Sequence, residues 1–424
     1  MARTGIRKTA LSLAVAGAFA GGVSQAHASA FALIEQSASG LGNSYAGAAA
    51  VAEDASIIFY NPAGMSLLPG GMQVSAGLAL INLSAKFSDS GSIASTSPAP
   101  RPLGNNGGNA GDLSAVPNVY FAMDVAPNWK VGVGVSVPFG LKTEYDPAWI
   151  GRFQAIKSDI STLNINPSVS YKLNQTVSLG FGLNYQSIDA ELTKAVNLGL
   201  SEEIADIKAK DNSGWGANLG AMFQVAPDTR LGVSYRSSIK YHLTGTATFS
   251  QNNPVPSANA STDIKMPDSA SIAVHHRLNP GWTLLADVTR TGWSKIKELK
   301  IESDTLGTLN NTPENFKNTW RVGVGAVYRY DDAWAIKMGA AYDQSPVNDT
   351  DRTPRLPDNN RLWLSFGGQY KLSKDGTLDF GYAHLFIKNA SINQNAGDAN
   401  FNGQLVGTYK GSVDILGAQF AYRF

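Results

Sequence analysis

The sequence predicts an all-β protein: a transmembrane antiparallel β-barrel of about fourteen strands, with an N-terminal hatch plugging its lumen. Three observations support this prediction. Apolar residues alternate with period 2 along most of the 424-residue chain, short turns alternate with long loops, and the chain ends on alternating aromatic residues. Because no run of about 20 apolar residues follows the N-terminal segment, transmembrane helices are not expected.

The alternation marks the individual strands. In 129–140, 176–186 and 320–330, branched and aromatic residues occupy one face, whereas glycine and polar residues occupy the other. This period of 2 is the signature of a strand that separates two environments. Counting every such segment gives fourteen: roughly 72–87, 115–126, 129–140, 160–173, 176–191, 213–226, 229–248, 268–278, 281–291, 318–330, 333–343, 359–371, 376–388 and 411–424.

The connections predict that these strands form a barrel domain of residues 72–424. Every second connection is a tight turn, whereas the others run from about 15 to 30 residues. An even strand number with short turns at one end is typical of an outer-membrane barrel, and a soluble sandwich or propeller is the alternative. The segment from Leu416 to Phe424 alternates to a final aromatic residue, as outer-membrane proteins usually do. The tight turns are Pro127-Asn128, Asn174-Gln175, Pro227-Asp228, Asn279-Pro280, Asp331-Asp332 and 373–376.

The first 28 residues are predicted to be a secretory signal peptide. A basic start precedes an apolar run, and Ala26-His27-Ala28 fits the small-x-small cleavage rule, with cleavage after Ala30 as the alternative. Removing residues 1–28 takes three of the 34 basic residues and leaves 31 against 33 acidic ones, so no nucleic-acid partner is expected. The exported chain has no cysteine, so its stability must come from extensive regular structure.

Residues 29–71 precede the first predicted strand and are expected to be the hatch. They are too irregular for a strand and too apolar for a free tail. Side chains alone do not fill a barrel of about fourteen strands, so this segment is expected to plug the lumen. Glu35, Glu53 and Asp54 are expected to face polar residues of the wall, and residues 57–60 to line an apolar space. The alternative is that this segment only blocks the lumen as a structural element.

Residues 31–64 carry a resemblance to a known family, in the segment FALIEQSASGLGNSYAGAAAVAEDASIIFYNPAG. This segment is similar to the N-terminal hatch of the FadL/TodX family of outer-membrane transporters of long-chain fatty acids and hydrocarbons. The motifs Gly40-Leu41-Gly42 and Asn61-Pro62-Ala63 fall at the spacing of that family. The similarity continues in VPNVYFA, in WIGRFQAIKSDISTLNINPSVSYKLN, and in TWRVGVGAVYRYDDAWAIKMGAAYDQSPV followed by LPDNNRLWLSFGGQY. It implies a fourteen-stranded barrel with a hatch in the outer membrane of a Gram-negative bacterium, in agreement with the strand count.

The third predicted strand contains Pro138, Phe139 and Gly140. Proline removes a ladder donor, and proline with glycine inside a strand marks a bulge or bend, unless Pro138 simply ends the strand. The resemblance implies an inward kink here that opens the wall laterally, with the hatch motif beside it. On this hypothesis the turn Asn61-Pro62-Ala63 engages the backbone groups freed at the kink.

Two further residues are assigned roles by the resemblance. Phe31 matches an aromatic residue that reaches the family's high-affinity pocket, with plain anchoring of the terminus as the alternative. Asp343 matches an acidic residue at the outer end of strand 11 that influences gating, with a solvated loop carboxylate as the alternative. The family's basic residue for the fatty-acid carboxylate has no counterpart, because Leu192 follows Glu191. This leaves room for uncharged substrates.

The loop at 192–212 carries Leu200, Ile204 and Ile207 at helical spacing, with acidic residues between them. This spacing predicts one or two turns of amphipathic helix. The resemblance implies that such loops form an external apolar groove for first capture of the substrate. A loop helix that contacts only its neighbours is the alternative.

The function expected from the sequence is uptake of long-chain fatty acids or similar hydrophobic molecules. The route would run from an external groove to a lumen pocket and then laterally into the membrane. The partners expected are the substrate, outer-membrane lipid and lipopolysaccharide, and the barrel-assembly machinery, for a monomeric protein. A hydrocarbon channel, a polar-solute channel, and an adhesin or phage receptor are the alternatives. No cofactor, metal site or enzymatic activity is expected, because adjacent His275 and His276 point to opposite faces of a strand and no catalytic motif occurs.

Overall fold

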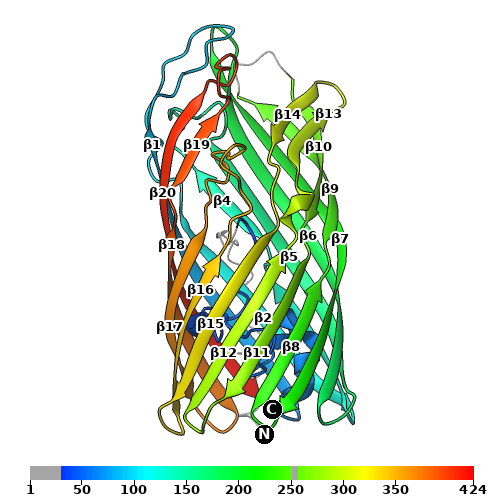
Figure 1. Ribbon diagram of the computed structural model, residues 1–424. Coiled ribbons are helices and arrows are strands. Elements are labelled where there is room, and N and C mark those ends of the chain that lie inside the picture. Colours follow the sequence, from blue (N-terminus) through cyan, green and yellow to red (C-terminus); the bar gives the residue numbers. More distant parts are fainter. Residues whose placement is uncertain (1–29, 251–255) are drawn as a thin grey trace, which may run out of the picture.

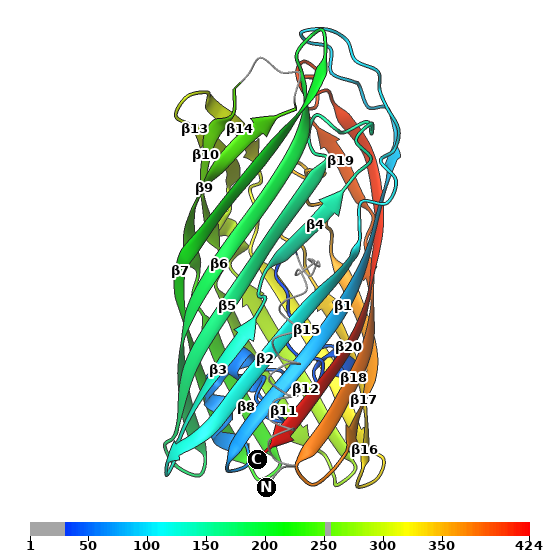
Figure 2. The same ribbon diagram turned by 180° about the vertical axis from the view of Figure 1, so that it is seen from behind.

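The barrel wall is one antiparallel sheet in which the first and last strands pair with each other (Figures 1 and 2). The computed structural model describes residues 30–250 and 256–424, so the predicted signal peptide lies outside the described residues. In that part of the chain, no helix is long and apolar enough to cross a membrane. Pairing of β1 with β20 runs from Gln73 opposite Arg423 to Asp89 opposite Gly407 and closes the barrel.

The described residues form twenty strand segments, which make fourteen wall strands because six of these are interrupted. The interrupted strands are β3/β4, β8/β9, β10/β11, β12/β13, β14/β15 and β18/β19. The predicted fourteen-stranded barrel is therefore confirmed. The segments are β1 (Met72–Asp89), β2 (Leu113–Ala126), β3 (Trp129–Ser136), β4 (Gly140–Glu144), β5 (Lys157–Lys172), β6 (Val177–Asn197), β7 (Glu202–Ala226), β8 (Thr229–Arg236), β9 (Ile239–Phe249), β10 (Ala258–Met266), β11 (Ser269–Arg277), β12 (Trp282–Thr291), β13 (Glu298–Ser303), β14 (Gly307–Pro313), β15 (Thr319–Arg329), β16 (Trp334–Asp343), β17 (Arg361–Lys371), β18 (Gly376–Ile387), β19 (Ala390–Gln394) and β20 (Leu405–Arg423).

The outer face of the barrel suits a lipid environment. Outward side chains such as Val322, Val324 and Phe366 are large, apolar and exposed. Near the tight turns, aromatic residues form cross-strand pairs with ring centroids 4.5–4.7 Å apart, as expected for a girdle at a membrane interface. These pairs are Trp129–Tyr171, Trp282–Tyr328 and Trp334–Tyr370.

The predicted amphipathic helix in the loop 192–212 is wrong. β6 and β7 continue outward as a long hairpin, with Asn197 paired to Glu202 and Leu200 fully exposed in its turn. In a strand, Ile204 and Ile207 point to opposite faces: Ile204 is exposed, whereas Ile207 is buried inside the barrel. These residues therefore share no apolar face.

Residues 30–71 lie inside the barrel near the tight-turn end (blue in Figures 1 and 2). This segment, called the hatch below, contains η1 (Leu41–Asn43), α2 (Ile57–Tyr60) and η2 (Pro62–Leu67), and another short helix, η3 (Trp293–Lys295), interrupts the wall. Two of the three hatch carboxylates bind the wall as predicted. Glu53 accepts from Lys337 Nζ at 2.8 Å, and Asp54 accepts from Gln419 Nε2 at 2.9 Å. Glu35 also faces charged groups of the wall, Arg361, Asp343 and Arg321, but both of its carboxylate oxygens are buried without a hydrogen-bond partner.

Glycines let the hatch approach the wall closely. A β-carbon at Gly42 would lie 2.8 Å from Gly367 Cα of β17, and one at Gly220 would lie 1.9 Å from Asn61 Oδ1. Real β-carbons do not come so near to other atoms, so both positions require glycine. The Gly42 contact explains why the predicted Gly40-Leu41-Gly42 motif is needed where η1 meets the sheet.

Replacing Gly220 by alanine is expected to loosen the hatch without unfolding the barrel. The new methyl group must displace Asn61, and such overpacking costs about 1–3 kcal/mol. Limited proteolysis of the folded barrel should then cleave the hatch faster than in the wild type. Gly281→Ala is the control, because its β-carbon would have no atom nearer than 3.5 Å. If the hatch of Gly220→Ala were cleaved no faster than the wild-type hatch, the close contact between Gly220 and Asn61 would be contradicted.

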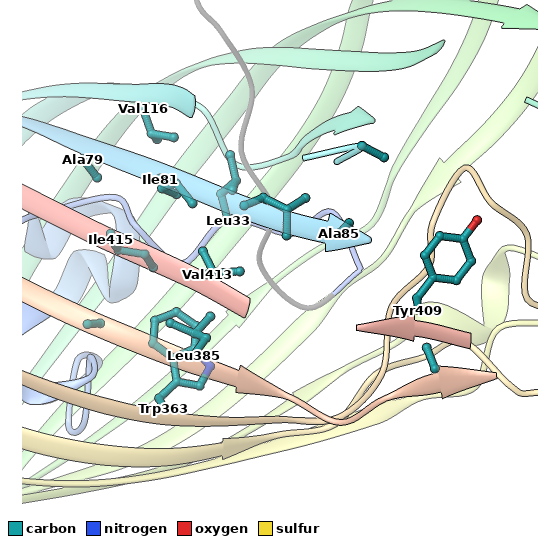
Figure 3. Close-up of a cluster of buried hydrophobic side chains, with 14 of the residues drawn as sticks. Leu33, Ala79, Ile81, Ala85, Val116, Trp363, Leu385, Tyr409, Val413 and Ile415 are labelled. Atoms are coloured by element: carbon teal, nitrogen blue, oxygen red, sulfur yellow. The ribbon is translucent and has the colours of Figure 1, made fainter. Parts of the chain in front are cut away.

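An apolar cluster extends from the hatch along one side of the lumen (Figure 3). It combines Leu33 of the hatch with inward side chains of β1, β17, β18 and β20, including Ile81, Trp363, Leu385 and Val413. Water-filled porins have polar interiors. A lumen with an apolar side is therefore unsuited to an open aqueous pore.

Candidate functional site

The wall is broken at the third strand, at the position predicted from Pro138. β3 ends at Ser136, opposite Asn164 of β5, and β4 begins at Gly140, opposite Ser161. The third strand therefore holds one residue more than its neighbour, which is a bulge. On the other side, β2 pairs with β3 only as far as Val119 opposite Val135, and β4 pairs with β5 but not with β2.

The first residues of the hatch satisfy the backbone groups freed at this break. Leu33 N donates to Pro138 O at 2.8 Å, and Gly140 N donates to Phe31 O at 2.9 Å. The Gln36 side chain both donates to Val137 O at 2.7 Å and accepts from Val137 N at 3.1 Å. Residues 31–36 thus replace the missing neighbour strand.

The hypothesis that Asn61-Pro62-Ala63 binds the freed groups is wrong. Asn61 is fully buried, and its Nδ2 donates to Ala49 O of the hatch at 2.8 Å and to Ala221 O of β7 at 3.1 Å. It also lies 3.3 Å from Val233 O of β8, and its Oδ1 accepts from Ala63 N, which caps η2. The motif therefore fixes the hatch to β7 and β8, and the backbone groups freed at the break are bound by residues 31–36 instead.

A cavity of about 170 Å³ lies between the hatch and the break. It collects Pro62, Pro138, Phe139 and Asp343 among the predicted site residues. Phe59 and Tyr60 of α2 also line it, as expected for residues 57–60, whereas Ile57 and Ile58 pack in a separate buried apolar cluster. Gly40, Gly42, Ala63 and Gly140 do not line the cavity, nor do Leu200, Ile204 and Ile207.

Phe31 does not line the cavity, but it contacts two residues that do. Its ring meets Trp293 edge-on at 4.8 Å and lies 6.2 Å from Phe139, and all three side chains are buried. Aromatic pairs at these separations are stabilising beyond the area that they bury. Phe31 is thus seated in an apolar pocket that adjoins the break.

Asp343 is buried at the end of β16 and is not a solvated loop carboxylate. Its cross-strand neighbours are Arg321 on β15 and Arg361 on β17, both also buried. Opposite charges directly across a sheet attract each other. The carboxylate therefore has two cations beside it.

The hatch carboxylate of Glu35 is expected to make docking pH-dependent. Burial raises the pKa of Glu35 to about 7, so the docked hatch holds a proton that the released hatch gives up. Because the folded pKa is raised, docking weakens as pH rises from about 5 to 7, and between pH 6 and 8 release should become about tenfold more favourable. Hydrogen exchange of residues 31–36, corrected for the intrinsic rate, measures this change. Glu35→Gln should remove the pH dependence, and a dependence that persists in this variant would refute the assignment.

Sequence reasoning missed three residues of this site. Gln36, Trp293 and Arg236 bind at the break or line the cavity. Trp293 follows Gly292, which comes directly after the end of β12, and Arg236 ends β8. Both residues therefore lie at strand breaks, which a strict alternation pattern does not reveal. In the described part of the chain, no group of three His, Asp or Glu side chains is placed to hold a metal ion.

These features define a class of protein, an outer-membrane β-barrel closed by its own N-terminal segment. They are the closed wall, the lipid-compatible outer face, and the lumen that is plugged and partly apolar. A family model for outer membrane protein transport proteins (OMPP1/FadL/TodX) matches residues 19–424, and the chain belongs to this family. Its place is therefore the outer membrane of a Gram-negative bacterium.

Relatives and solved structures agree with this assignment. The chain is 29% identical over 455 residues to the long-chain fatty acid transport protein of Salmonella typhi, covering 100% of this chain and 99% of that one. It is 28% identical over 399 residues to outer membrane protein P1 of Haemophilus influenzae, covering 85% and 86%. A FadL homologue of Pseudomonas aeruginosa has the same fold, with a TM-score of 0.85 at 24% identity over 93% of this chain and 100% of that one. The Ralstonia pickettii toluene transporter TbuX matches with a TM-score of 0.66 at 20% identity over 92% and 100%.

Proposed function

We propose that this protein takes up long-chain fatty acids or similar hydrophobic molecules and releases them laterally into the outer membrane through the break in the third strand. The observation that supports this most directly is the place of the cavity. It borders Pro138 and Phe139, where the wall has lost its pairing to β2.

The driving force is desolvation of the substrate. Burial of apolar surface contributes roughly 25 cal/mol per Å², so an apolar lumen binds a hydrophobic solute that a polar channel would not hold. The cavity offers such a surface, because Phe59, Phe139 and Trp293 line it. First capture would occur on the outer loops, where the β6–β7 hairpin exposes Leu200.

The hatch residues 31–36 serve as the gate in this scheme. They occupy the break by main-chain hydrogen bonds, and Phe31 fills the adjoining aromatic pocket. A substrate that displaces Phe31 from this pocket would also withdraw residues 31–33 from the third strand. Asp343 lies on the cavity wall and would influence this step through its neighbouring arginines.

Uptake of small aromatic hydrocarbons is the second candidate, and the size of the cavity favours it. At about 170 Å³ the cavity is close to the roughly 150 Å³ of an apolar cavity known to bind benzene. A long acyl chain is larger and requires the cavity to extend, for example into the Phe31 pocket. The similarity in fold to the toluene transporter TbuX is compatible with uptake of either a fatty acid or a small aromatic hydrocarbon.

Uptake by intact cells tests the proposal. Cells without a transporter of their own would express this protein and receive labelled oleate or labelled toluene, beside cells with an empty vector. Oleate uptake supports the fatty-acid route, and toluene uptake alone supports the hydrocarbon route. Uptake of neither by a correctly inserted barrel would contradict the proposal and favour an adhesin or receptor. Steady ion conductance in a planar bilayer would instead indicate a polar-solute channel.

A further inference from the structure

Three lysines lie close together on the outside of the barrel, near the outer ends of β1, β18 and β20. Lys86 and Lys410 are directly opposite each other in the pairing of β1 with β20, and Lys388 follows the end of β18. Lys388 and Lys410 also border one small cavity. All three lysines are exposed, whereas the adjacent Ala85 and Tyr409 belong to the buried cluster inside the barrel (Figure 3). The lysines therefore form one outward patch, called the lysine patch below.

The protein itself does not balance the charge of the lysine patch. In the described part of the chain, none of the three amines has an Asp or Glu oxygen within 4.0 Å. Asp89 and Asp414, the carboxylates of β1 and β20, have other partners. Asp89 accepts from a loop amide at 3.0 Å, and Asp414 accepts from a tyrosine hydroxyl of β18 at 2.6 Å. Because like charges directly across a sheet repel each other, an anion between Lys86 and Lys410 would stabilise this part of the wall.

The lysine patch lies just beyond the apolar part of the outer face. Tyr422 of β20 is at the tight-turn end, opposite Gly376, and Lys410 is twelve residues away along the same strand. At about 3.4 Å per residue and a tilt of about 40°, this segment rises about 31 Å, whereas the apolar band of an outer-membrane barrel is about 25 Å tall. The patch is therefore at the level of the head groups of the outer leaflet.

The outer face changes from apolar to polar to charged toward the lysine patch. Leu80 and Leu416 are opposite each other and exposed. Between them and the lysines lie polar side chains, among them the opposed pair Ser84 and Ser412. Neither serine hydroxyl forms a hydrogen bond in the part of the chain that the structure describes. An apolar base, a hydrogen-bonding middle and a positive end thus follow one another along β1 and β20.

We propose that the lysine patch binds the phosphate groups of a phosphorylated glycolipid of the outer leaflet, the lipid A part of lipopolysaccharide. The sugar of this lipid meets the serine hydroxyls, and its acyl chains lie on the leucines. An ammonium group and a phosphate form charge-assisted hydrogen bonds, and a phosphate between Lys86 and Lys410 removes their mutual repulsion. The inference does not depend on the proposed function, because the patch lies outside the lumen.

A second pair of opposed lysines provides a matched control. Lys240 of β9 and Lys265 of β10 are directly opposite each other, and the neighbours of Lys240 on its strand are buried, so this pair also points outward. Here, however, the exposed Asp263 lies two residues from Lys265 on the same face and offers a negative charge. Lys240→Gln/Lys265→Gln therefore removes as much charge as Lys86→Gln/Lys410→Gln, but at a pair with a carboxylate beside it.

Titration of the purified, folded barrel in detergent with lipid A tests the proposal. Dephosphorylated lipid A and phosphatidylglycerol are the comparison ligands, and each variant is first shown to have the heat-modifiable mobility of the wild type. Lys86→Gln/Lys410→Gln should weaken lipid A binding by at least about tenfold, because two cations beside a phosphate are lost. Lys240→Gln/Lys265→Gln should bind lipid A as the wild type does.

Unchanged lipid A binding in Lys86→Gln/Lys410→Gln would overturn the proposal. Equal weakening in the two double variants would overturn it as well, because the barrel would then attract anionic lipid through its overall charge. The proposal would also fail if the wild type bound dephosphorylated lipid A or phosphatidylglycerol as tightly as lipid A. The first result would exclude recognition of the phosphates, and the second would exclude recognition of a glycolipid.

Discussion

Deleting Pro138 is expected to stop uptake while leaving the barrel folded. From Ser136 to Gly140 the third strand takes four steps, where β5 takes three from Asn164 to Ser161. Removing one residue restores a common register, so the ladder with β5 becomes continuous. We expect the straightened strand then to pair with β2 beyond Val119, which closes the break. Uptake should fall by more than about tenfold, because a closed barrel has no lateral exit.

Pro138→Ala is the matched control for this deletion. It keeps the extra residue and hence the bulge, so it should retain most of the uptake. Both proteins should reach the outer membrane in equal amounts and show the same heat-modifiable mobility. Wild-type uptake by the deletion variant would mean that the substrate leaves by another route.

Changing Asn61 to aspartate is expected to release the hatch. The side chain keeps its shape but loses the Nδ2 donor that serves Ala49, Ala221 and Val233, and it places a carboxylate against their carbonyl oxygens. Leaving buried acceptors unpaired beside a new charge costs about 2–5 kcal/mol. Two further hydrogen bonds join the hatch to β8, from Arg230 to Ala50 O and from Arg236 to Phe59 O, and neither replaces the lost contact with β7. We therefore expect the hatch to detach there before the wall unfolds.

Planar-bilayer recording measures this release. The wild type should show little conductance, because the hatch fills the lumen, whereas Asn61→Asp should show frequent openings. Asn212→Asp, at an exposed position of β7, makes the same chemical change and should behave as the wild type does. If Asn61→Asp showed no openings, contacts other than those of Asn61 would hold the hatch in place.

The strands could be predicted from the sequence because lipid imposes a simple pattern. Where one face meets lipid and the other the lumen, as in β15, apolar and small or polar residues must alternate, and period 2 is visible. Beyond the membrane the outward face meets water instead of lipid, and polar and apolar residues no longer alternate: Glu203 is buried, whereas Ile204 is exposed. For this reason the spacing of apolar residues predicts a helix in the outer half of the β6–β7 hairpin. Ile204 and Ile207 in fact lie on opposite faces of a strand segment whose outward face does not contact lipid.

The site could be predicted only in part. Pro138 signals its break locally, since proline cannot donate to a ladder. The partners of Asn61 lie about 160 to 172 residues away, on β7 and β8, and no local pattern indicates such a contact. Likewise, Gln36 binds Val137, which is 101 residues away in the sequence. Glutamine is common in loops, so its presence at this position gives no signal of the contact.

An engineered disulfide between the hatch and the break tests the central claim, which is that substrate leaves through the break in the third strand when residues 31–33 are displaced. Ala32 and Phe139 form an antiparallel bridge without mutual hydrogen bonds, in which Cα atoms are typically about 4.5 Å apart, within reach of a disulfide. The chain has no other cysteine to interfere with Ala32→Cys/Phe139→Cys. Uptake by the double variant would be measured oxidised and after reduction, with each single variant beside it. We expect the oxidised protein to be inactive and reduction to restore uptake. Equal uptake in both states would show that substrate does not leave past residues 31–33 at the break in the third strand.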